Sequence, residues 1–355
     1  MKIYLVFFFI LLSYSVKAQV APQSTNEDER KELSSDKNSE SIGYSANNYQ
    51  LFNSRRDALL QSGIPSNQLG TDQQLNALSQ GHFMISNNNH AELMMTYWLG
   101  GKNTLVASNL LSAYNAEPNN SDAFDEMLEY ANWTNNLTLE TEVAQKIKES
   151  NKYAYGIYQY SRDLLNSVPS DAILITYGEV ETICARVIQL TENLQPNVVI
   201  IREEWLEKYR YSSENLSVLG LQLSSDYYDS KSKWMALTAH KEHVFLSLTI
   251  PLEKLNPHLD HLYLTGLTFQ YSNSKLSNLQ TMKENWENLY NQRNFNKSED
   301  DYYSKNLLSN YLISGIKVYS HYNANGEEKK AKALKDKLKK IAEKSGQKEK
   351  LKYWF

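Results

Sequence analysis

Cysteine, proline and glycine are scarce in this chain of 355 residues, which has one cysteine, 7 prolines and 13 glycines. A single cysteine excludes an internal disulfide framework and any zinc or iron–sulfur site built from several cysteines. The low glycine and proline contents exclude collagen-like and proline-rich classes. Basic charge is not in excess either, because the formal net charge at pH 7 is −4. Nucleic acid is therefore not an expected partner.

Motifs for metal and cofactor chemistry are also lacking. The one cysteine, Cys184, lies in an apolar helical stretch and is expected to be buried as a small hydrophobic residue. Two histidine pairs, His240 with His243 and His258 with His261, have an i, i+3 spacing that brings both side chains to one face only on a helix. Neither pair belongs to the Glu-containing metalloprotease motif, and no glycine-rich phosphate loop occurs. No metal or cofactor is expected.

The N-terminus has the pattern of a secretory signal peptide. Lys2 is followed by the apolar run Ile3–Leu12 and by small residues at the −3 and −1 positions before Gln19. A run of about ten apolar residues fits a signal peptide, whereas a membrane span needs about 20. We expect residues 1–18 to be removed and the mature chain, without a transmembrane segment, to be exported to the periplasm or the extracellular space. Association with the outer membrane is an open alternative.

Composition and periodicity divide the rest of the chain into four parts. Residues 19–48 are rich in Ser, Asn, Glu and Lys and are expected to form a disordered linker, because they cannot bury enough apolar surface to offset the entropy of ordering. Residues 49–150 have helical periodicity, residues 151–300 combine short apolar runs with helices, and residues 301–355 form a C-terminal helical hairpin and tail. The expected fold class is α+β, with tetratricopeptide-like hairpins flanking a small α/β domain.

The first helical part matches the 34-residue tetratricopeptide pattern. Counted from Asn87, the unit puts Tyr97 and Ala113 at positions where large and small residues interlock between two antiparallel helices. Gly101 falls at the turn between the helices, and Pro118 falls after the second helix, where proline cannot continue it. The pattern therefore predicts a helical hairpin over this segment.

Two further units are weaker. The unit from Ser121 has Glu140 where a small residue is expected, and an isolated unit from Leu312 has its turn at Gly326. Unrelated helical hairpins are the alternative.

Stacked helix pairs form a concave face, on which aromatic side chains anchor a protein partner because they bury much area with little loss of side-chain entropy. Although most aromatics here are expected in the core, four near the first two units are candidate partner-binding residues: Tyr97, Trp98, Tyr130 and Trp133.

A strand–helix–strand unit is predicted after the helical part. Ala172–Thr176 and Pro196–Ile201 are short continuous apolar runs, typical of buried parallel strands, with a helix from about Glu179 to Asn193 between them. The runs Val244–Ile250 and Leu262–Gln270 are expected to add strands. Because α/β folds bind ligands at the carboxyl ends of their strands, the candidate ligand-binding residues are Tyr177, Gly178, Glu179 and Glu181. Alternatively, both glutamates only complement the dipole at the helix N-terminus.

The same segment carries a family resemblance. Leu164–Gly178 (LLNSVPSDAILITYG), followed by a helix and by Gln195–Ile201 (QPNVVII), resembles the soluble C-terminal part of bacterial multi-spanning proteins of domain of unknown function 2723, which are similar to protein O-mannosyltransferases. Leu262–Phe269 and the hairpin around Gly326 agree in order, so the resemblance covers residues 153–345. It implies the accessory fold and does not imply transfer activity, because the membrane-embedded part expected to carry that chemistry is not found in this sequence.

The C-terminal tail is basic, with ten lysines between Lys329 and Lys350 against three acidic residues. An apolar stripe at helical spacing predicts a surface helix with a solvated face, and binding to anionic lipid or to an acidic partner is the alternative.

For the whole chain we expect a non-enzymatic exported protein that binds a protein or peptide partner, as an accessory component of a cell-envelope assembly. Two alternatives stay open: a glycan-related accessory protein or hydrolase using the edge near Glu179 and Glu181, and a purely structural scaffold.

Overall fold

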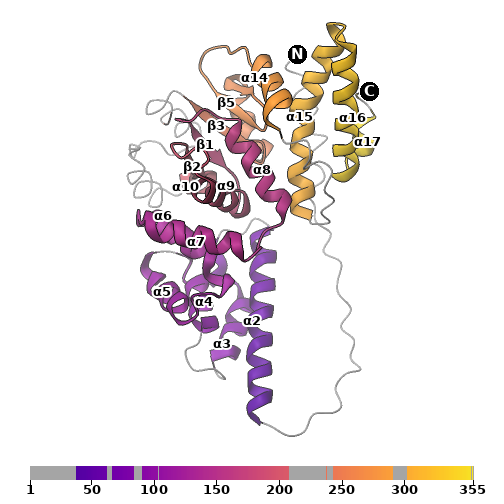
Figure 1. The fold of residues 1–355 in the computed structure, drawn as a ribbon. Coiled ribbons are helices and arrows are strands. Elements are labelled where there is room, and N and C mark those ends of the chain that lie inside the picture. The colour runs from indigo at the N-terminus through magenta and orange to yellow at the C-terminus, as the bar shows by residue number, and fades with distance from the viewer. Residues whose placement is uncertain are drawn as a thin grey trace. The chain divides into compact units, whose positions relative to one another are not determined.

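The fold combines helices with one small sheet, as the sequence predicts (Figure 1). The structure is a computed structural model that describes residues 37–61, 66–83, 90–102, 104–207, 237, 243–290, 302–352 and 354. Two compact units result, one ending at Ile147 and the other beginning at Lys148. Within the described ranges, none of the helices combines the length and apolar character needed to span a bilayer. The expected signal peptide lies outside the described residues.

The first unit consists of helices. Contacts are extensive between the first two helices and again between the next two. The helix expected from Tyr49 begins at Lys37, so the predicted linker is wrong for residues 37–48, while residues 19–36 lie outside the described residues. Once later turns are packed, extending a helix through polar residues costs little, and no proline interrupts this stretch. The helices are α2 (Lys37–Gln61), α3 (Gln73–Phe83), α4 (His90–Leu99), α5 (Ala107–Ala116), α6 (Phe124–Trp133) and α7 (Leu137–Glu149).

The hairpin of α4 and α5 is the predicted tetratricopeptide-like pair. Tyr97, Leu110 and Ala113 are fully buried between the helices, and Gly101 turns the chain with a φ of 85°. The second pair departs from the pattern at Glu140, which is buried and accepts a hydrogen bond of 3.0 Å from the Asn132 side chain. The second pair consists of α6 and α7, and a buried carboxylate in place of a small residue keeps these two helices from close approach. Helix α6 packs against α5 instead.

The second unit is built on a five-stranded sheet of order β2-β1-β3-β5-β4. The predicted strand–helix–strand unit is confirmed, since β1 and β2 are parallel and α9 (Glu179–Glu192) connects them. Strand β3 lies parallel to β1 on its other side, and β5 and β4 continue the sheet antiparallel. The strands are β1 (Ile173–Thr176), β2 (Val199–Arg202), β3 (Val244–Ser247), β4 (Leu262–Leu264) and β5 (Thr268–Tyr271).

The run Leu262–Gln270, expected as one strand, is instead a hairpin of β4 and β5. Gly266 has a φ of 151°, and the Thr265 N–H donates to the Thr268 carbonyl over 2.9 Å. Two apolar strands that meet at a single turn glycine read as one apolar run, because no polar loop separates them. The Thr265–Leu267 turn reverses the chain, so the run supplies two strands.

Helices pack around the sheet and join it to the C-terminal hairpin. Helix α8 (Tyr155–Asn166) lies beside α9 and contacts α15 (Tyr302–Ala324) (Figure 1). Helix α15 forms the predicted hairpin with α16 (Glu328–Lys344), turning at Gly326 with a φ of 72°. The hairpin therefore belongs to the same compact unit as the sheet. The shorter helices are α10 (Glu203–Glu207), α13 (Leu252–Leu255), α14 (Leu279–Glu284) and α17 (Lys348–Leu351).

Candidate functional site

The carboxyl ends of the three parallel strands form one edge of the sheet. The chain leaves β1 toward β2 on one side, while β3 pairs with the other side of β1. Open α/β sheets bind ligands at such a switch point, where connections diverge from neighbouring strands. The polar residues after β1 and β3 converge here, and α9 begins at the same edge.

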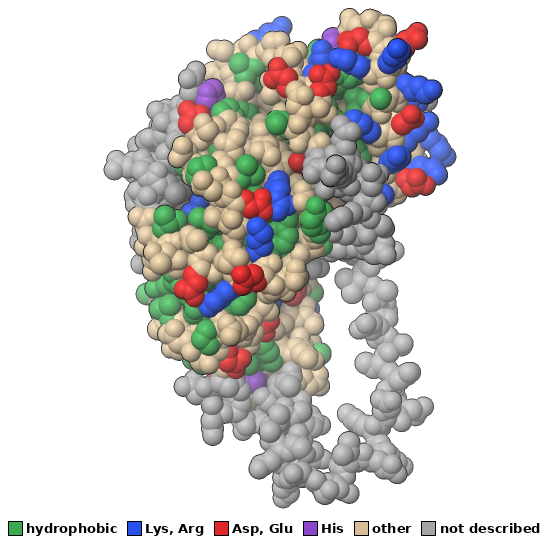
Figure 2. All heavy atoms as spheres, in the orientation of Figure 1, with side chains coloured by type: hydrophobic (Ala, Val, Ile, Leu, Met, Phe, Trp, Pro, Cys, Tyr) green, Lys and Arg blue, Asp and Glu red, His purple; other side chains and the backbone are tan. Residues whose placement is uncertain are grey.

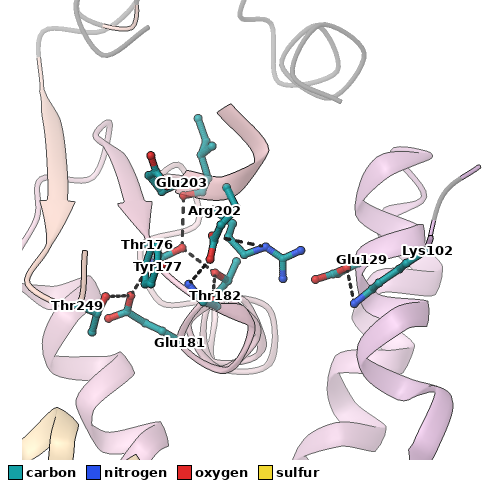
Figure 3. Close-up of polar contacts among 12 residues, drawn as sticks. Lys102, Glu129, Thr176, Tyr177, Glu181, Thr182, Arg202, Glu203 and Thr249 are labelled. Atoms are coloured by element: carbon teal, nitrogen blue, oxygen red, sulfur yellow. Dashed lines mark hydrogen bonds and ion pairs between the residues drawn. The ribbon is translucent and has the colours of Figure 1, made fainter. Parts of the chain in front are cut away.

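Glu181, in the first turn of α9, is the centre of this edge. Its Oε1 accepts a hydrogen bond from Ser247 Oγ over 2.7 Å. Its Oε2 accepts from Thr249 Oγ1 over 2.7 Å and from the backbone N–H of Tyr177 over 3.0 Å. The side chain has no exposed surface. Both carboxylate oxygens are thus held by donors from the β1–α9 turn and from the end of β3 (Figure 3).

Burial dominates the electrostatics of Glu181. Desolvation raises the pKa of its carboxyl from 4.5 to about 7, although the three hydrogen bonds favour the charged form and oppose the rise. Burial, and then the Glu181 charge, raise the pKa of the Tyr160 and Tyr303 hydroxyls well above their usual range. Near neutral pH, Glu181 is therefore the group among these three that gains or loses a proton, while both tyrosine hydroxyls stay protonated.

The turn into α9 depends on Gly178. Its φ of 78° and ψ of 159° form a backbone conformation that is essentially restricted to glycine. The Gly178 N–H donates to Glu204 Oε1 over 3.1 Å, and the Gly178 carbonyl accepts from Thr182 Oγ1 over 2.8 Å. Glu204, in α10 after β2, is therefore tied to the turn after β1.

A second carboxylate lies after β2. Glu203 is fully buried and pairs with Lys254 Nζ over 2.6 Å. The same ammonium lies 5.5 Å from the centre of the Tyr177 ring. Lys254 comes from α13, so this contact joins the segment after β3 to the end of β2.

The structure brings three of the four candidate ligand-binding residues into one hydrogen-bonded arrangement, namely Tyr177, Gly178 and Glu181. Glu179 is half-buried in the same turn. Sequence reasoning missed the partners of Glu181 on and after β3, and it missed Glu204 and Lys254. Ser247, a hydroxyl inside the apolar run Val244–Ile250, was the available signal. Chemically the arrangement holds a carboxyl in place and stores a proton, and it links three strands.

Histidine pairs do not converge on a metal site within the described residues, which contain no group of three or more metal-ligating side chains. His258 is buried against the Tyr271 ring, and His261 stacks on the same ring with centroids 5.5 Å apart. His240 lies outside the described residues. Packing against Tyr271 accounts for the second pair.

The candidate partner-binding aromatics divide into two groups. Tyr97 and Trp98 are buried in the core of the first unit, so their prediction as surface anchors is wrong. Both fall on the inner side of α4, where the interlocking of α4 with α5 requires large side chains. Tyr130 and Trp133 are half-buried near the end of α6 and keep exposed surface.

Trp98 lies under two cations. The Arg56 guanidinium carbon is 4.5 Å and Lys102 Nζ is 4.6 Å from the ring centre. Lys102 is itself buried and pairs with Glu129 Oε2 over 3.0 Å (Figure 3). This pair ties the α4–α5 turn to α6 and fixes Trp98 between polar neighbours.

Comparison of the chain with protein-family models, with curated proteins and with solved structures finds no match.

Proposed function

We propose that this protein is a non-enzymatic, exported helical-hairpin protein that binds a protein or peptide partner as an accessory component of a cell-envelope assembly. The binding surface lies at the turns of the first unit. It consists of Leu105, Tyr130, Trp133 and Leu137, which we call the turn surface.

Exposed leucines at two turns are the observation that carries the proposal. Leu105 is 80% exposed after the α4–α5 turn, and Leu137 is 60% exposed at the start of α7. Burying an exposed leucine side chain lowers the free energy of a complex, and contiguous exposed apolar residues mark interaction surfaces. Half-buried aromatics add area that a partner can cover.

Topology places these side chains on neighbouring turns. Trp133 ends α6, and Leu137 begins α7 across a short turn. The Lys102–Glu129 pair holds the α4–α5 turn, and with it the segment of Leu105, against the half of α6 that carries Tyr130. The α4–α5 turn and the α6–α7 turn therefore contribute to the same end of the first unit.

The sheet edge supports a structural role better than catalysis. Both oxygens of Glu181 are occupied by protein donors, and the side chain has no exposed surface for a substrate. A general acid or base needs to reach the proton it transfers. We therefore assign Glu181 a structural role.

Affinity isolation from intact cell envelopes tests the proposal. The wild-type protein is compared with the double variant Leu105→Ser/Leu137→Ser and with Leu289→Ser, which changes a 39% exposed leucine of the other unit. We expect one partner to be recovered in fixed ratio with the wild type and with Leu289→Ser, and to be lost with the double variant. All three proteins should unfold at similar temperature, because exposed side chains contribute little to folding.

Recovery of the wild type alone would overturn the proposal. Equal recovery of the partner with the double variant would move the binding surface away from these turns and overturn the assignment of the turn surface.

A further inference from the structure

Charge is strongly segregated along this chain. Residues 328–352, which span α16 and α17, contain eleven lysines and four acidic residues, a formal charge of +7. The whole chain carries −4, so the remaining residues carry −11. Figure 2 shows the basic side chains gathered along the outer edge of the C-terminal hairpin. We call the exposed lysines of residues 328–352 the lysine face.

The fold fixes the direction of this face. The apolar stripe of α16, including Leu334, Leu338 and Ile341, is buried, and α16 packs on α15. The lysines between these positions are therefore held outward on a rigid helix. A helix of 17 residues is about 25 Å long, so the charges form an extended row.

Much of this charge is not compensated within the described part of the chain. Lys329, Lys332, Lys339 and Lys340 are exposed and have no acidic side chain within 4.0 Å there. Burial and then the neighbouring charge of Lys340 lower the pKa of Lys344. The ammonium groups repel one another, and an anionic surface would relieve that repulsion.

The composition of the face favours lipid over protein. All eleven basic residues of the segment 328–352 are lysines, and none is an arginine. Protein interfaces are enriched in arginine and depleted in lysine. The arginine guanidinium forms two hydrogen bonds to one carboxylate, whereas the lysine ammonium is strongly hydrated and costs more to strip of its water. A hydrated layer of lipid phosphates suits lysine, and clusters of this kind on a helix attract anionic bilayers. Trp354, half-buried beside the last lysines, is of the type found at membrane interfaces.

We propose that the lysine face docks the protein on an anionic phospholipid bilayer through the lipid phosphates, without insertion of α16. The apolar side of α16 is already buried, so attraction is electrostatic. The rest of the chain carries a net negative charge, so the attraction to the bilayer comes from the lysine face. The proposal concerns the second unit and is independent of the turn surface.

Co-sedimentation of the full chain with vesicles tests this docking. We expect binding to vesicles that contain phosphatidylglycerol, no binding to pure phosphatidylcholine vesicles, and release at high salt. Lys339→Gln/Lys340→Gln should weaken binding by about tenfold or more, since each lysine near an anionic surface contributes on the order of 1 kcal/mol. Asp336→Asn/Glu343→Gln, which raises the charge of the face, should strengthen it.

The matched control is Lys152→Gln/Lys275→Gln, which removes the same charge at exposed positions outside the face. This control should bind phosphatidylglycerol vesicles nearly as well as the wild type. Equal loss in both double variants, or binding that persists at high salt and on phosphatidylcholine, would overturn the proposal. Tighter binding to polyglutamate than to the vesicles would assign the face to an acidic protein and overturn it as well.

Discussion

Ser247, the last residue of β3, donates a hydrogen bond of 2.7 Å to the carboxylate of Glu181 in the first turn of α9. These residues are far apart in the sequence, and their contact joins the first turn of α9 to the carboxyl end of β3. Because Glu181 is buried, the contact couples folding to pH.

Replacing Glu181 with Gln should flatten the dependence of stability on pH. The carboxyl titrates near 4.5 when unfolded and at about 7 when folded, because burial disfavours its charge. Between these values the folded state binds the extra proton, so this contribution to the free energy of unfolding is full below 4.5 and is lost as pH rises through 7. The loss is about 3 kcal/mol, measurable by urea unfolding between about pH 5 and pH 8.

The control for that experiment is Glu179→Gln. Glu179 lies in the same turn but is half-buried, so this variant should keep the slope of the wild type. A Glu181→Gln slope equal to that of the wild type would show that the carboxyl does not titrate in this range.

Gly178→Asn should destabilise the second unit by about 1–3 kcal/mol. A Cβ at this position has room, with the Tyr303 hydroxyl as its nearest neighbour at 3.6 Å, so the loss comes from the backbone conformation. Gly326→Asn is the matched control. The Glu327 N–H donates to the Tyr322 carbonyl around Gly326, a helix ending that accepts Asn. Equal losses in urea unfolding would contradict the backbone explanation.

Lys102→Met should destabilise the first unit by about 3–5 kcal/mol, because it leaves the buried Glu129 carboxylate without its cation. Adding Glu129→Gln should recover part of the loss. Lys146→Met removes a partly exposed pair with Glu142 in the same unit and should change stability by at most about 1 kcal/mol. Urea unfolding of the wild type and of these three variants measures the difference, and a double variant no more stable than Lys102→Met would argue against the pairing.

Tyr311→Phe should loosen the C-terminal hairpin from the sheet unit. The Tyr311 hydroxyl on α15 donates to Asp163 Oδ2 on α8 over 2.7 Å, and both groups are buried. Removing the donor should lower the free energy of unfolding by about 1–3 kcal/mol. Hydrogen exchange of α15 amides should also become faster. Tyr319→Phe, at a half-buried position on the same helix, is the control and should leave both measurements nearly unchanged.

Much of the fold follows from local pattern. Apolar runs bounded by turns predict β1 and β2 with α9 between them, and helical spacing with Gly101 and Gly326 predicts two hairpins, because these signals depend only on neighbouring residues. The hairpin of β4 and β5 was not predicted, since only the short Thr265–Leu267 turn separates the two strands.

Local sequence pattern is sufficient to predict the α+β class, the hairpin turns, the parallel unit and the lysine-rich helix, since periodicity and composition act over a few residues. The packed fold was needed to show that Glu181 is buried and meets Ser247 and Thr249, that Tyr97 and Trp98 belong to the core, and that α15 joins the sheet unit. Burial and pairing between distant segments depend on how complete helices and strands pack, and no local spacing encodes that.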